Sequence, residues 1–158
     1  MVDAGTAAIL TQAATGSFVL LAGLVALGAA SPRRYTISFS SFLVLWGVSL
    51  VAGNLGGLAL QGGDLAQAQE LLTLQAVFQG IAYLPLVVFT LSYPPSRGIE
   101  LDRWPIVATL LAPSVFIAGV VAVDPSLLHR GFALVDGSLV GGWGWAGAVM
   151  YTLFTVAA

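Results

Sequence analysis

Five long apolar runs constrain the fold of this chain more than any other feature of its sequence. Charged and turn-forming residues separate them, and they cover roughly 7–30, 37–60, 71–92, 104–123 and 139–158. Each run holds about 20 residues or more, which is the length a helix needs to cross a hydrocarbon core about 30 Å thick. Lipid offers the backbone no hydrogen bonds, and the strict alternation of barrel strands is missing. The sequence therefore predicts one all-α domain, a transmembrane bundle of about five spans.

The composition also places the chain in lipid. Only 8% of its 158 residues are charged, 58% are hydrophobic, and the mean hydropathy is +0.97. A soluble domain carries about 25% charged residues, so the charges here are too sparse to cover the surface of a water-soluble globule. We expect a multi-pass protein of the cell membrane, with the lipid bilayer as its first partner.

The arginines alternate between the predicted connectors and indicate an orientation. Arg33 and Arg34 lie between the first and second runs, and Arg97 and Arg103 lie between the third and fourth. The connectors on the other side hold only Arg130. Because basic residues concentrate in cytoplasmic loops, we expect the amino terminus outside the cell and the carboxyl terminus in the cytoplasm.

The two ends of the sequence lead to two further expectations. The first six residues contain Asp3 and no basic residue, whereas a cleavable signal peptide opens with positive charge. We therefore expect the first run to be retained as a span. The last run reaches Ala158 with no polar segment behind it, and because multi-span proteins usually leave their last helix through a charged or aromatic segment, we expect a piece of a longer protein.

Missing residue types exclude several classes of function. There is no lysine for a retinal or pyridoxal Schiff base, and no cysteine for a disulfide, an iron–sulfur cluster or a reactive thiol. A single histidine cannot build a multi-histidine metal site or ligate a haem from both faces. We expect neither a metal nor a cofactor.

The few charges point away from catalysis, transport and nucleic acid. No spaced carboxylate pair, Ser/His/Asp set or phosphate-binding glycine loop occurs in a suitable context. All seven carboxylates lie outside the predicted spans or at their edges, whereas ion-coupled transporters usually keep one inside. A net charge of −2 argues against nucleic-acid binding. We expect no enzymatic activity in this chain.

Small residues recur at four-residue spacing, which lets helix backbones approach closely in lipid. The sets are Ala22, Ala26 and Ala30, then Gly53 and Gly57, then Gly142 and Ala146. Packing between helices is the plain interpretation of this spacing. Formation of a homo-oligomer through Gly53 and Gly57, or docking of partner membrane helices, is the alternative.

The most polar side chains within the predicted spans are Asn54, Gln75 and Gln79. The two glutamines share a helix face that Tyr83 continues one turn further on. Amides in hydrocarbon need partners, so this stripe predicts either a pocket that opens outward or hydrogen bonds that join helices. Asp124 and His129 lie at the predicted outer end of the fourth run, where they could contact a ligand or act as a gate. We therefore name Asn54, Gln79, Tyr83, Asp124 and His129 as candidate ligand-binding residues.

Several short motifs carry a resemblance to a known family. They are Trp46 in the second run, the segment 89–94 (FTLSYP), the pair Arg103-Trp104, and the segment 123–129 (VDPSLLH). Their order resembles the amino-terminal seven-helix membrane sensing region of bacterial and archaeal histidine kinases over about residues 37–158. The family has seven spans followed by cytoplasmic signalling modules, whereas this sequence offers about five spans and no kinase or phosphoacceptor module.

The resemblance implies a sensor or receptor input module that takes part in signal transduction. Spans two to five would form an outward-facing pocket for a small or lipophilic molecule, and helix movement would report its binding across the membrane. Two other functions stay open: a structural or accessory subunit of a larger membrane complex, and part of an oligomeric transporter or channel.

Overall fold

The described part of the computed structural model contains four helices and a short β-hairpin. It comprises residues 4–29, 33–94, 103–124, 133–135 and 138–140. The elements in chain order are α1 (Ala4–Ala29), α2 (Arg34–Gln61), α3 (Leu65–Ser92), α4 (Trp104–Val123), β1 (Ala133–Val135) and β2 (Ser138–Val140).

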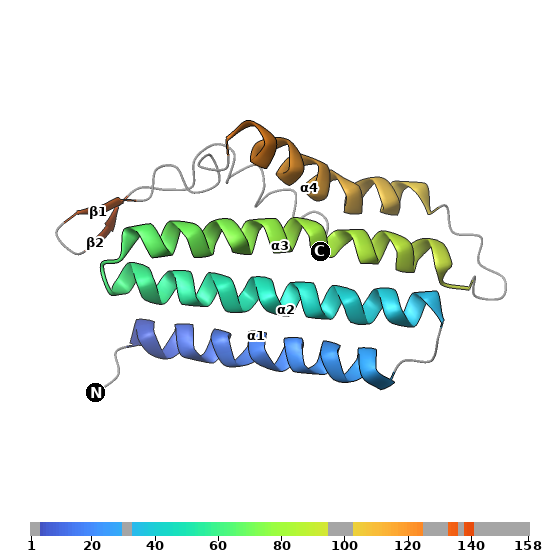
Figure 1. Ribbon diagram of the computed structural model, residues 1–158, viewed down its shortest axis with the longest axis horizontal. Helices are drawn as coiled ribbons and strands as arrows, with labels where there is room; N and C mark the ends of the chain where they lie inside the picture. Colours follow the sequence, from blue (N-terminus) through green and yellow to red (C-terminus); the bar gives the residue numbers. More distant parts are fainter. Residues whose placement is uncertain (1–3, 30–32, 95–102, 125–132, 136–137, 141–158) are drawn as a thin grey trace.

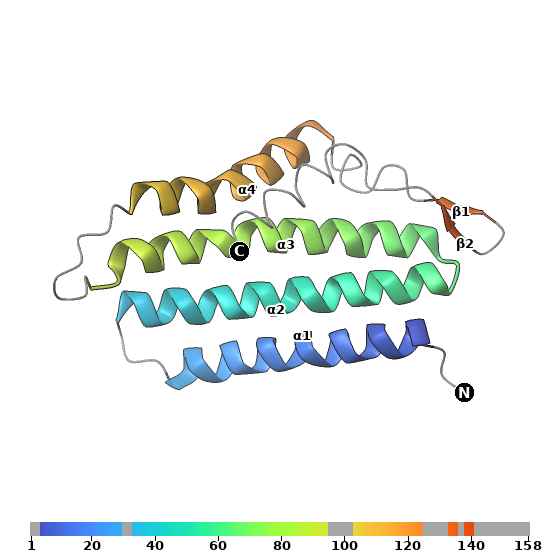
Figure 2. The same cartoon turned by 180° about the vertical axis from the view of Figure 1, so that it is seen from behind.

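The helices lie side by side in chain order and alternate in direction (Figure 1), and the reverse view shows the same order (Figure 2). α2 packs against both α1 and α3, and α3 packs against α4. Because neighbours are antiparallel, α2 and α4 begin at the end of the layer where α3 finishes. The opposite end holds the short turn between α2 and α3.

That turn is set by glycine and by an aspartate cap. Gly63 adopts a φ of 82°, a left-handed conformation that glycine reaches without a steric cost. Asp64 follows it, and its side chain accepts a hydrogen bond from the backbone N–H of Gln67 at 3.0 Å. This cap satisfies one of the amide groups left open at a helix start, so α3 begins directly after the turn.

Glycines bring α1 and α2 into close backbone contact. A Cβ placed on Gly47 of α2 would lie 2.6 Å from the Cα of Leu20, and one on Gly23 of α1 would lie 2.7 Å from the backbone nitrogen of Val44. Such spacing leaves no room for a side chain. Between α1 and α2 the close approach predicted from small residues is therefore present at glycines outside the four-residue patterns, whereas Gly53 of those patterns contacts the side chain of Gln75 in α3.

A buried apolar cluster joins α3 and α4. Its members are Ala76, Tyr83, Leu110, Ile117 and Val120. Ser114 of α4 donates a hydrogen bond of 2.6 Å to the backbone oxygen of Gly80 in α3, and a Cβ on Gly80 would lie 2.9 Å from Ile117. Pro113 lies within α4 and is fully buried.

Within the part of the chain that the structure describes, three helices are long and apolar enough to cross a membrane, which supports a membrane protein. They are α2, α3 and α4, with mean hydropathies of 1.8, 1.8 and 2.5 over their most apolar windows. In α1, which covers the first apolar run, the apolar segment Ala13–Ala29 is shorter.

The predicted start of the fifth helix, at residue 139, is wrong. Residues 138–140 form β2, which pairs antiparallel with β1 so that Val135 lies opposite Ser138 and Ala133 opposite Val140. The sequence between the strands is Asp136-Gly137, a pair typical of two-residue hairpin connections. A helix therefore cannot begin at 139, and the all-α prediction holds only apart from this hairpin. The rest of the predicted span, 141–158, lies outside the described residues.

Candidate functional site

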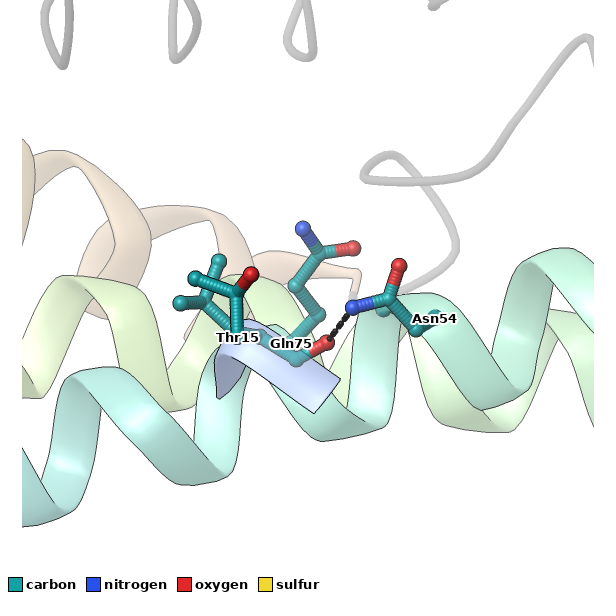
Figure 3. Close-up of a pocket in the computed structure, with 5 residues that line it drawn as sticks. Thr15, Asn54 and Gln75 are labelled. Carbon is teal, nitrogen blue, oxygen red and sulfur yellow. Dashed lines mark hydrogen bonds between the residues drawn. The ribbon is translucent and has the colours of Figure 1, made fainter. Parts of the chain in front are cut away.

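A hollow of about 250 Å³ is lined by residues of α1, α2 and α3, which lie side by side with α2 in the middle (Figure 1). It is lined by Thr15 of α1, by Leu50, Gly53 and Asn54 of α2, and by Gln75 of α3. Figure 3 shows Thr15, Asn54 and Gln75 gathered around it. Three polar side chains from three apolar helices thus converge on one space.

The glutamine is positioned by the backbone of α2. A Cβ on Gly53 would lie 2.5 Å from Cδ and 2.5 Å from Oε1 of Gln75, so only glycine leaves room for the amide. Ser49, one turn before Gly53, donates a hydrogen bond of 3.1 Å to the backbone oxygen of Gln75. Together these two contacts fix where α3 presents its amide to the hollow.

The other two polar residues use part of their hydrogen-bonding capacity within their own helices. Asn54, only 7% exposed, donates from Nδ2 to the backbone oxygen of Leu50 at 2.7 Å, the bond drawn in Figure 3. The hydroxyl of Thr15 donates to the backbone oxygen of Thr11 at 3.0 Å. Asn54 Oδ1 and the Thr15 oxygen keep acceptor lone pairs, and Gln75 offers both a donor and an acceptor.

The lining residues define the chemistry that the hollow suits. None carries a charge, and among the residues described no group of three or more His, Cys, Asp or Glu could hold a metal ion. An occupant that both donates and accepts hydrogen bonds would match the amides and the hydroxyl. An ion would lose its hydration without gaining a counter-charge.

Of the five residues predicted from the sequence, Asn54 lines the hollow. Gln79 is partly buried one turn beyond Gln75 and is not among the lining residues. Tyr83 is 2% exposed, and its ring meets that of Trp46 edge-on at 5.9 Å. Asp124 is the C-cap residue of α4. His129 lies outside the described residues.

Sequence reasoning did not select Thr15 or Gln75 as site residues. Gln75 was recognised as part of the polar stripe, but which member of that stripe faces α2 depends on the packing register. A usable signal was present in Gly53, because a glycine within a packed helix leaves room for a neighbouring side chain. Thr15 carries no comparable signal, since most threonines in apolar helices bond to their own backbone.

A continuous series of aromatic rings runs along the contact between α2 and α3, from Tyr83 to the end of the layer where α2 begins. Successive ring centroids are 5.1 to 6.1 Å apart. In order, the rings belong to Tyr83, Trp46, Phe42, Phe39, Phe89, Tyr93 and Tyr35. The series begins about two turns along α3 from Gln75, at about 3.6 residues per turn.

No family model matches the chain, and neither the curated proteins nor the solved structures include a significant match to it. The arrangement of its own residues therefore carries the functional argument.

Proposed function

We propose that this chain is the input module of a multi-pass membrane receptor in the cell membrane, and that the hollow lined by Thr15, Asn54 and Gln75 is where its signal binds. The observation that carries the proposal is the convergence of these polar side chains on one space of about 250 Å³. Polar groups are costly in hydrocarbon unless they meet partners. The resemblance to the sensing region of histidine kinases adds to this interpretation.

The chemistry of the hollow selects a small neutral ligand. Its uncharged lining favours a molecule that pairs with an amide, such as another amide, a urea or an alcohol. In the orientation that the arginines favour, the hollow lies nearer to the outer ends of the helices, because Asn54 is in the last third of α2 and Gln75 in the first half of α3. A signal from outside would reach this depth first.

Movement of α3 against α2 would report the binding. Gln75 contacts Gly53 and Ser49 of α2, so a ligand that pairs with its amide competes with this fit. The aromatic series continues the same helix contact toward the arginine-bearing end. A ligand drives such a movement only when it binds the two helix arrangements with different affinities.

The proposal is tested by measuring helix movement in lipid nanodiscs. The chain has no cysteine, so spin labels attached through Ala7→Cys in α1 and Gln67→Cys in α3 report one distance. The probes are small neutral amides, ureas and alcohols, with acetate and methylammonium as charged counterparts. We expect a neutral probe to shift the distance and the charged ones to leave it unchanged.

A matched pair of variants tests whether the change in spin-label distance arises from binding at the hollow. Gln75→Leu combined with Asn54→Leu removes two of the polar groups, whereas Gln79→Leu removes an amide on the same helix outside the hollow. The response should be lost in the first variant and kept in the second. A distance that no probe moves, or a response that survives in the double variant, would overturn the proposal.

A structural role in a larger membrane assembly is the second candidate, and one observation favours it. Large apolar side chains on the outer faces of α1 and α4 are strongly exposed, among them Phe18 at 72%, Val25 at 70% and Val115 at 67%. Lipid or partner helices would cover these faces equally well. Co-purification with a larger complex in fixed stoichiometry, with no response to any probe, would support this function.

A further inference from the structure

The charges of the described residues are separated between the two ends of the helical layer. Arg33, Arg34 and Arg103 lie where α2 and α4 begin and α3 finishes. The described carboxylates lie at the other end: Asp64 and Glu70 at the start of α3 and Asp124 at the finish of α4. The guanidinium groups therefore have no described carboxylate at their own end.

The sequence keeps this end positive when the connector between α3 and α4 is included. Residues 95–102 contribute Arg97, Glu100 and Asp102. Together with Arg33, Arg34 and Arg103, this makes four arginines and two carboxylates, which is a net charge of +2. The structure of the connector lies outside the described residues.

Arg33 is held beside an aromatic platform. Its Nη1 donates a hydrogen bond of 2.8 Å to the hydroxyl of Tyr35, whose ring meets Tyr93 of α3 edge-on at 5.6 Å. This hydrogen bond raises the pKa of the Arg33 guanidinium above its ordinary value, so the group stays charged. Arg34 is exposed beside it. Tyrosines at a helix end are typical of the headgroup level of a bilayer.

Arg103 reaches the same end of α3 from the side of α4. Its Nη1 donates to the backbone oxygens of Thr90 and Leu91 in the last turn of α3, at 2.9 and 3.2 Å. Tyr93 follows directly after that turn, so Arg103 and the Arg33–Tyr35 pair border the same helix end. A guanidinium has five N–H donors, and among the described residues the hydrogen bonds of Arg103 to α3 use only those on Nη1.

We propose that this end of the layer, defined by Arg33, Arg34, Arg103, Tyr35 and Tyr93, is a binding site for the phosphate headgroup of an anionic membrane lipid. Guanidinium groups pair with phosphate oxygens in a bidentate manner, and the tyrosine rings pack beside the glycerol region. Anionic lipids are enriched in the cytoplasmic leaflet, where the arginine distribution places this end. The bilayer itself supplies the ligand.

Lipid retained by the purified protein tests this site. The full chain is reconstituted into nanodiscs of phosphatidylcholine and phosphatidylglycerol in equal parts, extracted in mild detergent, and analysed by native mass spectrometry. We expect phosphatidylglycerol to be retained over phosphatidylcholine. Each arginine removed should lower that preference by about fivefold, because a basic residue near the surface contributes attraction of this order.

Two variants separate the site from general charge. Arg33→Gln with Arg34→Gln leaves the contact between Arg103 and α3 intact, so the bundle should still fold while the preference falls. Arg130→Gln removes one arginine that the sequence assigns to the opposite side, and it should keep the preference. Equal retention of both lipids, an unchanged preference in the double variant, or an equal loss in Arg130→Gln would each overturn the proposal.

A further experiment distinguishes a lipid headgroup from free phosphate as the ligand of this site. Inorganic phosphate added to nanodiscs of pure phosphatidylcholine should leave the Tm unchanged, whereas phosphatidylglycerol should raise it. If phosphate raised the Tm as much as the lipid does, the site would be one for soluble phosphate and the assignment to a lipid headgroup would be wrong.

Discussion

The side-chain amide of Gln75 lies directly over the Cα of Gly53, so close that a Cβ there would stand 2.5 Å from Gln75 Cδ. This contact joins the packing of α2 and α3 to the hollow, because the same amide lines it. Ser49 bonds to the backbone of Gln75 as well. The position of one glutamine is thus fixed by a glycine that has no side chain of its own.

Gly53→Ala should remove the response to ligand with little effect on folding. The added methyl group displaces the Gln75 amide, but that amide ends a flexible side chain and can move aside. We expect a loss of stability at the low end of the range of about 1–3 kcal/mol that overpacking costs, and loss of the probe-induced change in spin-label distance. A variant that responds as the parent does would show that the placement of Gln75 does not matter.

Gly47→Ala should be far more damaging. Its Cβ would meet the Cα and backbone nitrogen of Leu20 at 2.6 Å, and a backbone cannot swing aside, so α1 and α2 must separate. Overpacking of this kind costs about 1–3 kcal/mol, measured as a lower midpoint of thermal unfolding in detergent.

Gly28→Ala is the matched control for that variant. No described atom lies within 4 Å of a Cβ there, and alanine is the better helix former by about 0.8–1.0 kcal/mol. The control should unfold at the same temperature as the parent or slightly above it. If Gly47→Ala proved as stable as Gly28→Ala, the close packing of α1 on α2 would be wrong.

Ser114→Ala should weaken the contact between α3 and α4 slightly. The serine hydroxyl donates to the backbone oxygen of Gly80 at 2.6 Å, and hydrogen bonds between membrane helices contribute about 0.6 kcal/mol on average. Ser38→Ala removes a hydroxyl that bonds within its own helix, to the oxygen of Arg34, and should cost less. An equal loss of stability in both variants would contradict a specific bond between the helices.

Breaking the aromatic series should disconnect the two ends of the layer. Near the middle of the series, the ring centroids of Phe39 and Phe89 are 5.6 Å apart. Aromatic pairs of this kind contribute about 0.5–1.5 kcal/mol to stability. In Phe39→Leu with Phe89→Leu, spin labels at the outer end should still respond to the probe while labels at the arginine-bearing end should not. A full response at both ends would mean that the signal passes elsewhere.

Hydropathy located the helices but not all of their ends. The fourth run at 104–123 agrees with Trp104–Val123, whereas the third, predicted from 71, begins at Leu65. The first turns of α3 are rich in glutamine and glutamate, so they carry no apolar signal, and the cap at Asp64 sets the start instead. The hairpin at 133–140 was missed because its valines and leucines are equally typical of an apolar helix.

The site was predicted only in part, for a geometric reason. Gln75 and Gln79 are related by about 40° of rotation around the helix, since successive residues advance about 100°. Which of them faces the neighbouring helix depends on the register between α2 and α3, and that register is set by contacts such as the one between Gly53 and Gln75. A single sequence does not reveal which residues of two helices contact each other.

Labelling of single cysteines in intact cells tests the central claim, that the helices cross the membrane with the arginine-bearing end inside. Gly62→Cys lies in the turn between α2 and α3, and Arg34→Cys lies at the start of α2, at the opposite end of the layer. A membrane-impermeant maleimide should modify position 62 directly and position 34 only after the cells are permeabilised. Modification of both positions from the same side of the membrane would contradict the account.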